Sequence, residues 1–99
     1  MASITIHVEN TQTGKNANAP IPVNGQKQTF GTLYGANLGK PVISTDVFVK
    51  DVGAAQNVKI TVESPSGNAV PLNSNGTPYR FDNGQPKDVT DWYLVAEQK

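Results

Sequence analysis

Six residues in the last quarter of the chain have side chains suited to ligand binding. Carboxylate and amide oxygens accept hydrogen bonds, and a tyrosine combines an apolar ring with a polar hydroxyl. These groups can recognise a glycan or a protein surface without catalysing a reaction. We therefore predict a ligand-binding site formed by Tyr79, Asp82, Asn83, Asp88, Asp91 and Tyr93.

The aspartates of this group also raise the question of a calcium site. They fall within ten positions, 82–91, and calcium prefers oxygen ligands supplied by loops. The EF-hand pattern is absent, however, and Asp and Asn are ordinary residues of turns and helix caps. We expect no bound metal and no cofactor.

A second candidate site is the polar run over residues 10–19. This run has no apolar periodicity and predicts a long loop, which in a compact domain is either functional or mobile. Aromatic platforms for a ligand could come from Tyr34, Tyr79, Trp92 and Tyr93. We expect Trp92 in the core, and Tyr93, its neighbour on a strand, on the opposite and more exposed face.

No pattern in the sequence predicts one of the common catalytic sites. His7 is its single histidine, and a Ser-His-Asp triad would need it as the base. Alternation places His7 on the polar face of a strand, where we expect it to be exposed. The chain contains no cysteine, which excludes thiolate catalysis, disulfides and Cys-based metal sites. We expect a protein that is not an enzyme.

Charge and hydropathy exclude two classes of partner. Eight basic and eight acidic residues cancel, and the basic ones form no stripe that could neutralise phosphates. No apolar run approaches the length of a membrane span. The start, residues 1–4, has neither a basic nor an apolar leader region. We expect neither nucleic-acid nor membrane binding, and a cytoplasmic protein by default, with the cell surface or the extracellular space as the alternative.

Gly31, Gly35 and Gly39 recur at every fourth position. A phosphate-binding loop would need Gly-Lys-Ser/Thr ahead of a helix, whereas Gly39-Lys40 is followed by Pro41. We expect these glycines to permit bends and bulges.

Apolar and polar residues alternate over most of the chain, which indicates half-buried strands. A strand around Pro20 and Pro22 would have to lie at a sheet edge. Residues 45–55 and 88–97 also fit a helical period, but β-branched and aromatic residues favour strands in both. The predicted strands cover residues 2–9, 26–34, 42–50, 58–63, 79–81 and 89–96.

Three Asn-Gly dipeptides mark turns, because Asn and Gly accept positive φ at low steric cost. Asn24-Gly25 predicts a tight two-residue hairpin, and Asn75-Gly76 lies in a wider loop. Asn83-Gly84 opens the acidic stretch beside the aromatic residues.

Residues 58–72 (Val-Lys-Ile-Thr-Val-Glu-Ser-Pro-Ser-Gly-Asn-Ala-Val-Pro-Leu) form a predicted hairpin with a Ser-Pro-Ser-Gly turn. This segment resembles a hairpin of several extracellular β-sandwich families, such as the P domain that follows subtilisin-like catalytic domains. The resemblance implies a sandwich and assigns neither a family nor a function.

Together these patterns predict one all-β domain over residues 1–99, a small antiparallel β-sandwich of about seven strands, immunoglobulin-like or jelly-roll-like. We expect a binding module for a protein surface or a glycan. The alternative is a structural subunit of a surface or phage-type assembly, with edge strands of identical chains pairing as one form. The expected core is Ile4, Ile6, Val8, Phe30, Val47, Val49, Val58, Ile60, Val62, Phe81, Trp92 and Leu94.

Overall fold

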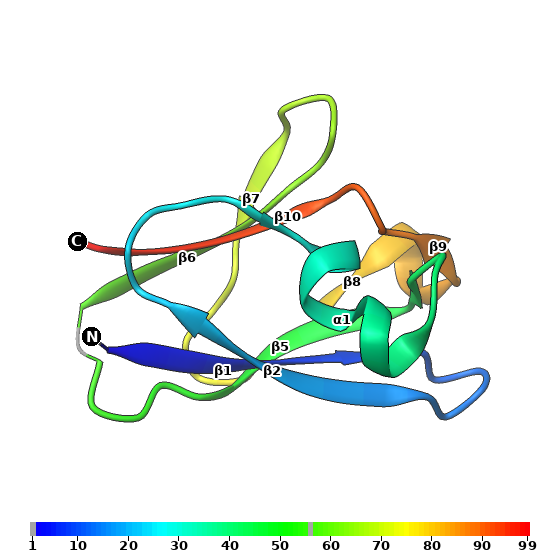
Figure 1. Cartoon of the computed structure of the whole chain (residues 1–99), viewed down its shortest axis with the longest axis horizontal. Coiled ribbons are helices and arrows are strands. Elements are labelled where there is room, and N and C mark those ends of the chain that lie inside the picture. Colours follow the sequence, from blue (N-terminus) through cyan, green and yellow to red (C-terminus); the bar gives the residue numbers. More distant parts are fainter. Residues whose placement is uncertain (1, 56) are drawn as a thin grey trace.

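The computed structural model describes residues 2–55 and 57–99. In this part of the chain, antiparallel strands form two four-stranded sheets, ordered β2-β1-β5-β8 and β3-β10-β6-β7, and a ladder of β4 and β9 (Figure 1). The ten described strands exceed the expected number because four of them hold only two residues. The elements are β1 (Ser3–Glu9), β2 (Asn16–Pro22), β3 (Gln28–Thr29), α1 (Phe30–Leu38), β4 (Ile43–Ser44), β5 (Asp46–Asp51), β6 (Val58–Glu63), β7 (Ala69–Pro71), β8 (Tyr79–Arg80), the 3-10 helix η1 (Phe81–Gly84), β9 (Lys87–Asp88) and β10 (Tyr93–Gln98).

The first sheet is built around β1, which lies between β2 and β5. Ile6 and Val8 of β1 are opposite Val49 and Val47 of β5, and all four side chains are buried. This pattern confirms the half-buried strand that period-two alternation predicts.

β2 lies at the edge of the first sheet, as its prolines predict, because proline cannot donate a backbone hydrogen bond to a further strand. It pairs with β1 from Asn16 onwards. The expectation of a loop as far as residue 19 is therefore wrong, and the connection between the two strands covers only residues 10–15.

The second sheet is built on the long pair β6 and β10. Val62 is opposite Leu94 and Ile60 is opposite Ala96, with all four side chains buried. Strand β10 confirms the strand predicted over residues 89–96 from Tyr93 onwards, whereas residues 89–92 form a turn before it. The helical alternative is wrong. The predicted turn before β7 is also confirmed, with the Ser64 N–H donating to the Asn68 carbonyl at 2.8 Å.

Of the strand expected over residues 26–34, only Gln28 and Thr29 are in a strand, and α1 begins at Phe30. Thr29 caps the helix: its hydroxyl oxygen accepts the Thr32 N–H at 3.1 Å, which satisfies a backbone donor that the first helical turn leaves unpaired. Phe30, Tyr34 and Leu38, spaced by four, are the large buried residues of this helix.

The glycines at every fourth position do not form the expected bends and bulges within a strand. Gly31 and Gly35 lie inside α1, where their missing side chains make room for neighbours. An ideal Cβ on Gly31 would lie 2.8 Å from the Thr90 Cγ2 atom, and one on Gly35 would lie 2.7 Å from the Lys40 Cε atom. The third glycine, Gly39, follows the helix with a φ of +84°, a common way for a helix to end.

The expected two-residue hairpin at Asn24-Gly25 is wrong. This dipeptide lies in the connection from β2, in the first sheet, to β3, in the second. Gly25 has a φ of +76°, and its N–H donates to the Ala96 carbonyl at 2.8 Å. The dipeptide therefore turns the chain from one sheet towards the other.

The other two Asn-Gly dipeptides lie in connections without a tight hairpin. Asn75-Gly76 lies in the long connection between β7 and β8, as expected. At Asn83-Gly84, three successive residues (Asp82, Asn83 and Gly84) have positive φ values of 49°, 57° and 88°. This left-handed stretch follows Phe81 directly.

Ten of the twelve expected core residues are buried; Val58 and Trp92 are partly buried and pack against the core. Phe81 is the centre of an aromatic cluster, with its ring edge-to-face with those of Phe30, Tyr79 and Trp92 at centroid distances of 5.9, 5.3 and 5.2 Å. The sequence analysis missed the buried residues Ala19, Ile21, Tyr34, Leu38, Val42, Ala55, Leu72, Val89, Val95 and Ala96.

Candidate functional site

The six residues predicted as a ligand site lie in five separate segments of the fold. Tyr79 belongs to β8 of the first sheet, and Tyr93 begins β10 of the second. Asp82 and Asn83 are exposed in η1, Asp88 is exposed in β9, and Asp91 is exposed in the turn before β10. None of these six residues lines the pocket described below.

One acidic side chain of this group, Asp88, stabilises a local turn. The Asp88 carboxylate accepts hydrogen bonds from the Thr90 hydroxyl at 2.6 Å and from the Thr90 N–H at 3.0 Å. These bonds lower the pKa of Asp88 below its usual value, because they stabilise the charged form. Within residues 2–55 and 57–99, no three His, Asp or Glu side chains are grouped as metal ligands.

The two tyrosines of the predicted site have different surroundings. The Tyr79 ring packs edge-to-face against Phe81 as part of the aromatic cluster. Tyr93 is partly exposed, with the Lys27 ammonium 5.6 Å from its ring centroid. Lys27 also forms an ion pair with Glu63 at 2.6 Å. Tyr93 therefore contributes to a small surface cluster, whereas Tyr79 mainly supports the core.

Tyr34, the remaining aromatic platform considered from the sequence, is fully buried. Its hydroxyl donates to the Ile6 carbonyl oxygen at 2.7 Å, which ties α1 to β1. Burial raises the pKa of this phenol well above its usual value, because the charged form would lose its hydration. Tyr34 has a structural role and offers no surface to a ligand.

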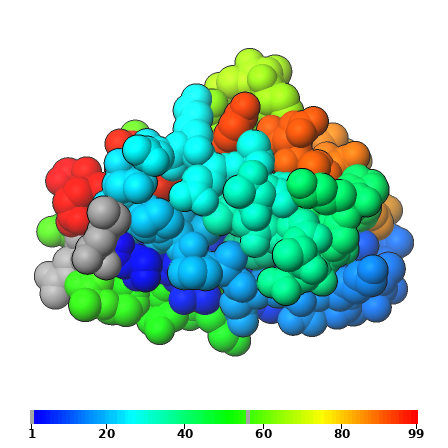
Figure 2. Space-filling view, viewed as in Figure 1, coloured from blue at the N-terminus to red at the C-terminus, as the bar shows by residue number. Residues whose placement is uncertain are grey.

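The second predicted site, the loop after β1, borders a pocket of about 350 Å³. Figure 2 shows α1 and the start of β2 side by side on the face where these elements meet. The polar side of the pocket comes from the loop, and its apolar side comes from the end of α1 and from three later residues. Its lining residues are Asn10, Gln12, Thr13, Lys15, Leu38, Pro41, Ile43 and Pro86.

Hydrogen bonds within the loop fix its shape. The Asn10 N–H donates to the Lys15 carbonyl, and the Asn10 carbonyl accepts the Gly14 N–H, both at 2.8 Å. The Asn10 Oδ1 atom accepts the Gln12 N–H at 3.0 Å, and the Thr13 hydroxyl oxygen accepts the Lys15 N–H at 3.3 Å. The pocket therefore has a preformed polar wall.

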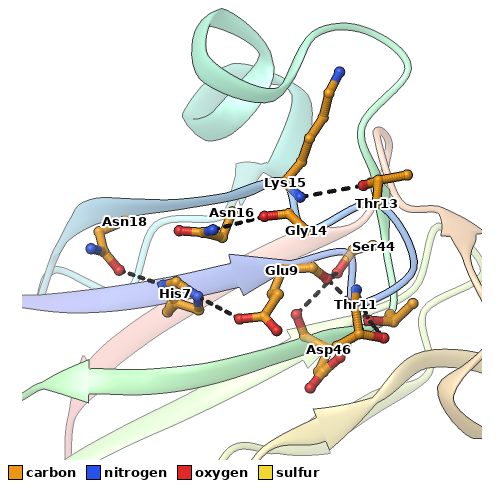
Figure 3. Close-up of polar contacts among 11 residues, drawn as sticks. His7, Glu9, Thr11, Thr13, Gly14, Lys15, Asn16, Asn18, Ser44 and Asp46 are labelled. Carbon is orange, nitrogen blue, oxygen red and sulfur yellow. Dashed lines mark hydrogen bonds and ion pairs between the residues drawn. The ribbon is translucent and has the colours of Figure 1, made fainter.

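A second set of hydrogen bonds joins the end of β1 and the first loop residues to Ser44 and Thr45, which precede β5 (Figure 3). The Thr11 N–H donates to the Thr45 hydroxyl oxygen at 3.0 Å. The Glu9 carbonyl accepts the Thr45 N–H and the Ser44 hydroxyl, both at 2.9 Å. Ser44 and Thr45 are fully buried, so the hydrogen bonds that hold the loop are shielded from water.

The expectation that His7 is exposed is wrong, because 8% of its surface is accessible. Its ring lies 4.7 Å from the Phe48 ring, between centroids. The Nδ1 atom is 2.7 Å from the Asn18 Oδ1 atom, and the Nε2 atom is 3.0 Å from a Glu9 carboxylate oxygen. Neighbouring strands cover this histidine, and both ring nitrogens have protein partners.

The loop of the pocket is visible in the sequence, whereas its apolar side is not. Leu38, Pro41, Ile43 and Pro86 come from three separate segments, and no spacing rule relates them. The prolines are a weak signal, because a proline close to a polar loop often restricts the loop to one conformation.

Comparison with known proteins gives no functional assignment: no family model, curated protein or solved structure matches this chain. In residues 2–55 and 57–99, no helix has both the length and the apolar character needed to cross a membrane.

Proposed function

We propose that this chain is a non-catalytic binding module that recognises a protein surface or a glycan through its loops. We further propose that its two four-stranded sheets pack as a small β-sandwich of immunoglobulin-like or jelly-roll-like character, which holds the loops in place. The observation that carries the proposal is the pocket of about 350 Å³ beside residues 10–15.

The chemistry of the pocket supports binding of a small polar group. Gln12 and Thr13 are exposed on its polar side, and their amide and hydroxyl groups both donate and accept hydrogen bonds. Leu38 and Ile43 lie on the apolar side, where the carbon skeleton of a ligand can be buried. Ligand pockets commonly combine an apolar lining with a few placed polar groups.

The composition of the edge strands favours binding through loops over assembly through strand pairing. Each four-stranded sheet has one edge strand with proline: β2, with Pro20 and Pro22, and β7, with Pro71. The opposite edges, β8 and β3, hold only two residues each. Prolines remove backbone donors, which protects an edge from pairing with another chain. This observation favours the binding module over a structural subunit assembled through edge strands.

A binding screen tests the proposal. The purified chain is applied to panels of glycans and surface proteins, together with a Gln12→Ala, Thr13→Ala double variant and a Lys50→Gln control. Lys50 is exposed in β5, away from the pocket lining. Losing one or two hydrogen bonds costs about 1–3 kcal/mol, so we expect binding to weaken roughly 5–150-fold in the double variant.

The control variant should bind like the wild type. A ligand that the double variant binds with unchanged affinity would show that the pocket is not the binding site. The alternative function is tested by size measurement in solution. An oligomer that forms in a concentration-dependent way, and that the Gln12→Ala, Thr13→Ala variant still forms, would favour the structural subunit.

A further inference from the structure

The lining of the pocket carries positive charge and no negative side chain. Of its eight residues, Lys15 is the only charged one, and none is acidic. The Lys15 side chain extends from the loop towards the segment that follows α1 (Figure 3). Its ammonium group forms no ion pair within the described part of the chain.

The neutral groups on this side of the pocket are available as donors. The Asn10 Oδ1 atom accepts the Gln12 N–H, which leaves the Asn10 NH₂ group to donate. The Thr13 oxygen accepts the Lys15 N–H, so the proton of its hydroxyl can be directed to a ligand. Together with the Lys15 ammonium, these groups suit a ligand that accepts hydrogen bonds and carries negative charge.

The position of α1 limits how much negative charge the pocket can accept. Leu38, in the last turn of the helix, lines the pocket, so the negative end of the helix dipole lies beside it. That end corresponds to about half an elementary charge, which the full charge of one lysine exceeds. A single carboxylate therefore fits better than a phosphate dianion, which usually binds arginines or a helix N-terminus.

From these observations, and resting on the function proposed above, we propose that the pocket binds a carboxylated sugar ring of a glycan, with Lys15 paired to the carboxylate. Its volume of about 350 Å³ is near the lower limit for ligand pockets and suits one ring. Leu38, Pro41 and Ile43 pack against the C–H face of the ring. An acidic peptide is a poorer fit, because extended peptides usually bind strand edges or long grooves, and β2 contains two prolines.

The test compares two sugars that differ only at C6, which is a carboxylate in one and a neutral hydroxymethyl group in the other. Methyl β-D-glucuronide and methyl β-D-glucoside are titrated into the ¹⁵N-labelled chain, and shifts of the backbone amide signals are followed. We expect signals of residues 10–15 to shift with both, and the glucuronide to bind about tenfold more tightly, since a charge-assisted hydrogen bond is stronger than a neutral one. Raising the salt concentration should weaken the binding of the glucuronide and leave the binding of the glucoside unchanged.

Two variants localise the effect. Lys15→Gln keeps a long polar side chain without the charge and should reduce the preference for glucuronide to near unity, while the glucoside still binds. Lys50→Gln removes an exposed lysine of β5 outside the pocket and should leave the preference intact.

The remaining outcomes distinguish failure of the carboxylate inference from failure of the proposed binding function. Equal binding of both sugars would overturn the carboxylate inference and leave a sugar-binding pocket. Binding of N-acetyl-aspartate amide as tight as that of glucuronide would overturn the sugar and indicate an acidic peptide. No shift of residues 10–15 with any of the three probes would overturn the carboxylate inference, whereas the proposed function would still be tested by the panel screen.

Discussion

Replacing Tyr34 with phenylalanine tests whether one buried hydrogen bond joins the helix to the first sheet. Tyr34 is fully buried, and its hydroxyl donates to the Ile6 carbonyl at 2.7 Å. Tyr34→Phe keeps the ring and its contact with Phe30, whose centroid lies 5.9 Å away. The substitution therefore isolates the hydroxyl group.

The expected loss is about 1–2 kcal/mol in the free energy of unfolding. A buried hydrogen bond contributes about 1 kcal/mol net, and a carbonyl left without its partner adds a cost of about 1–3 kcal/mol when no water replaces it. For a domain of this size, each kcal/mol lowers the melting temperature by roughly 4–8 °C.

Urea titration followed by Trp92 fluorescence measures the effect, with Tyr93→Phe as the control. Tyr93 is partly exposed, and its variant should lie within about 0.5 kcal/mol of the wild type. Equal stabilities of Tyr34→Phe and the wild type would refute the reasoning, because they would mean that the hydroxyl contributes nothing net.

The pH dependence supplies a second test of Tyr34. Its pKa is raised in the folded state, so its contribution to stability is complete below the ordinary tyrosine pKa of about 10 and is lost as the pH rises towards the folded value. The stability difference between the wild type and Tyr34→Phe should therefore shrink above about pH 10.

Three further substitutions test local contacts, and each is measured by urea titration. Gly31→Ala should lower stability by about 1–3 kcal/mol, because the new Cβ meets Thr90 at 2.8 Å from Cγ2 and 3.1 Å from the carbonyl oxygen. Gly35→Ala should be neutral or stabilising, because it meets only the flexible Lys40 side chain and alanine favours the helix. Asp88→Ala should be less stable at pH 7; the lowered pKa of Asp88 means that this difference shrinks as the pH falls below about 4.

Two results would contradict these predictions. Equal stabilities of the two glycine variants would show that the close approach of Thr90 does not limit Gly31. A stability difference for Asp88→Ala that stays constant from neutral to acidic pH would show that the charge of the carboxylate is not what stabilises the turn.

The sequence predicts the long strands well because their alternation is a local property. In β1 and β6, every second side chain faces the buried side of a sheet, so the apolar residues recur with a period of two. Pro20 and Pro22 likewise report the edge position of β2, because their missing N–H groups are incompatible with a central strand.

The helix escaped prediction because its own residues favour it only weakly. Gly31 and Gly35 both lower helix propensity, and nine residues are too few for an isolated helix to be stable. Its stability comes from Phe30, Tyr34 and Leu38, which are buried against other elements. Thr29 ahead of this spacing is the signal of a helix N-terminus that the sequence analysis did not use.

The candidate site likewise has one part that the sequence predicts and another that depends on the fold. The polar loop is visible in the sequence as a run without apolar periodicity, but its pocket depends on Leu38, Pro41, Ile43 and Pro86, which are brought together only by the fold. The six predicted site residues are close in sequence, yet Tyr79 and Tyr93 belong to different sheets.

By itself, the sequence determined the antiparallel strand pattern, several turns and the absence of cysteine chemistry, since each depends on residue type and near neighbours. The tertiary structure decided the burial of His7, the helix over residues 30–38 and the walls of the pocket. The physical reason is that burial depends on what a distant segment places beside a residue: Asn18 and Phe48 contact His7 from two other strands, and no local pattern encodes that proximity.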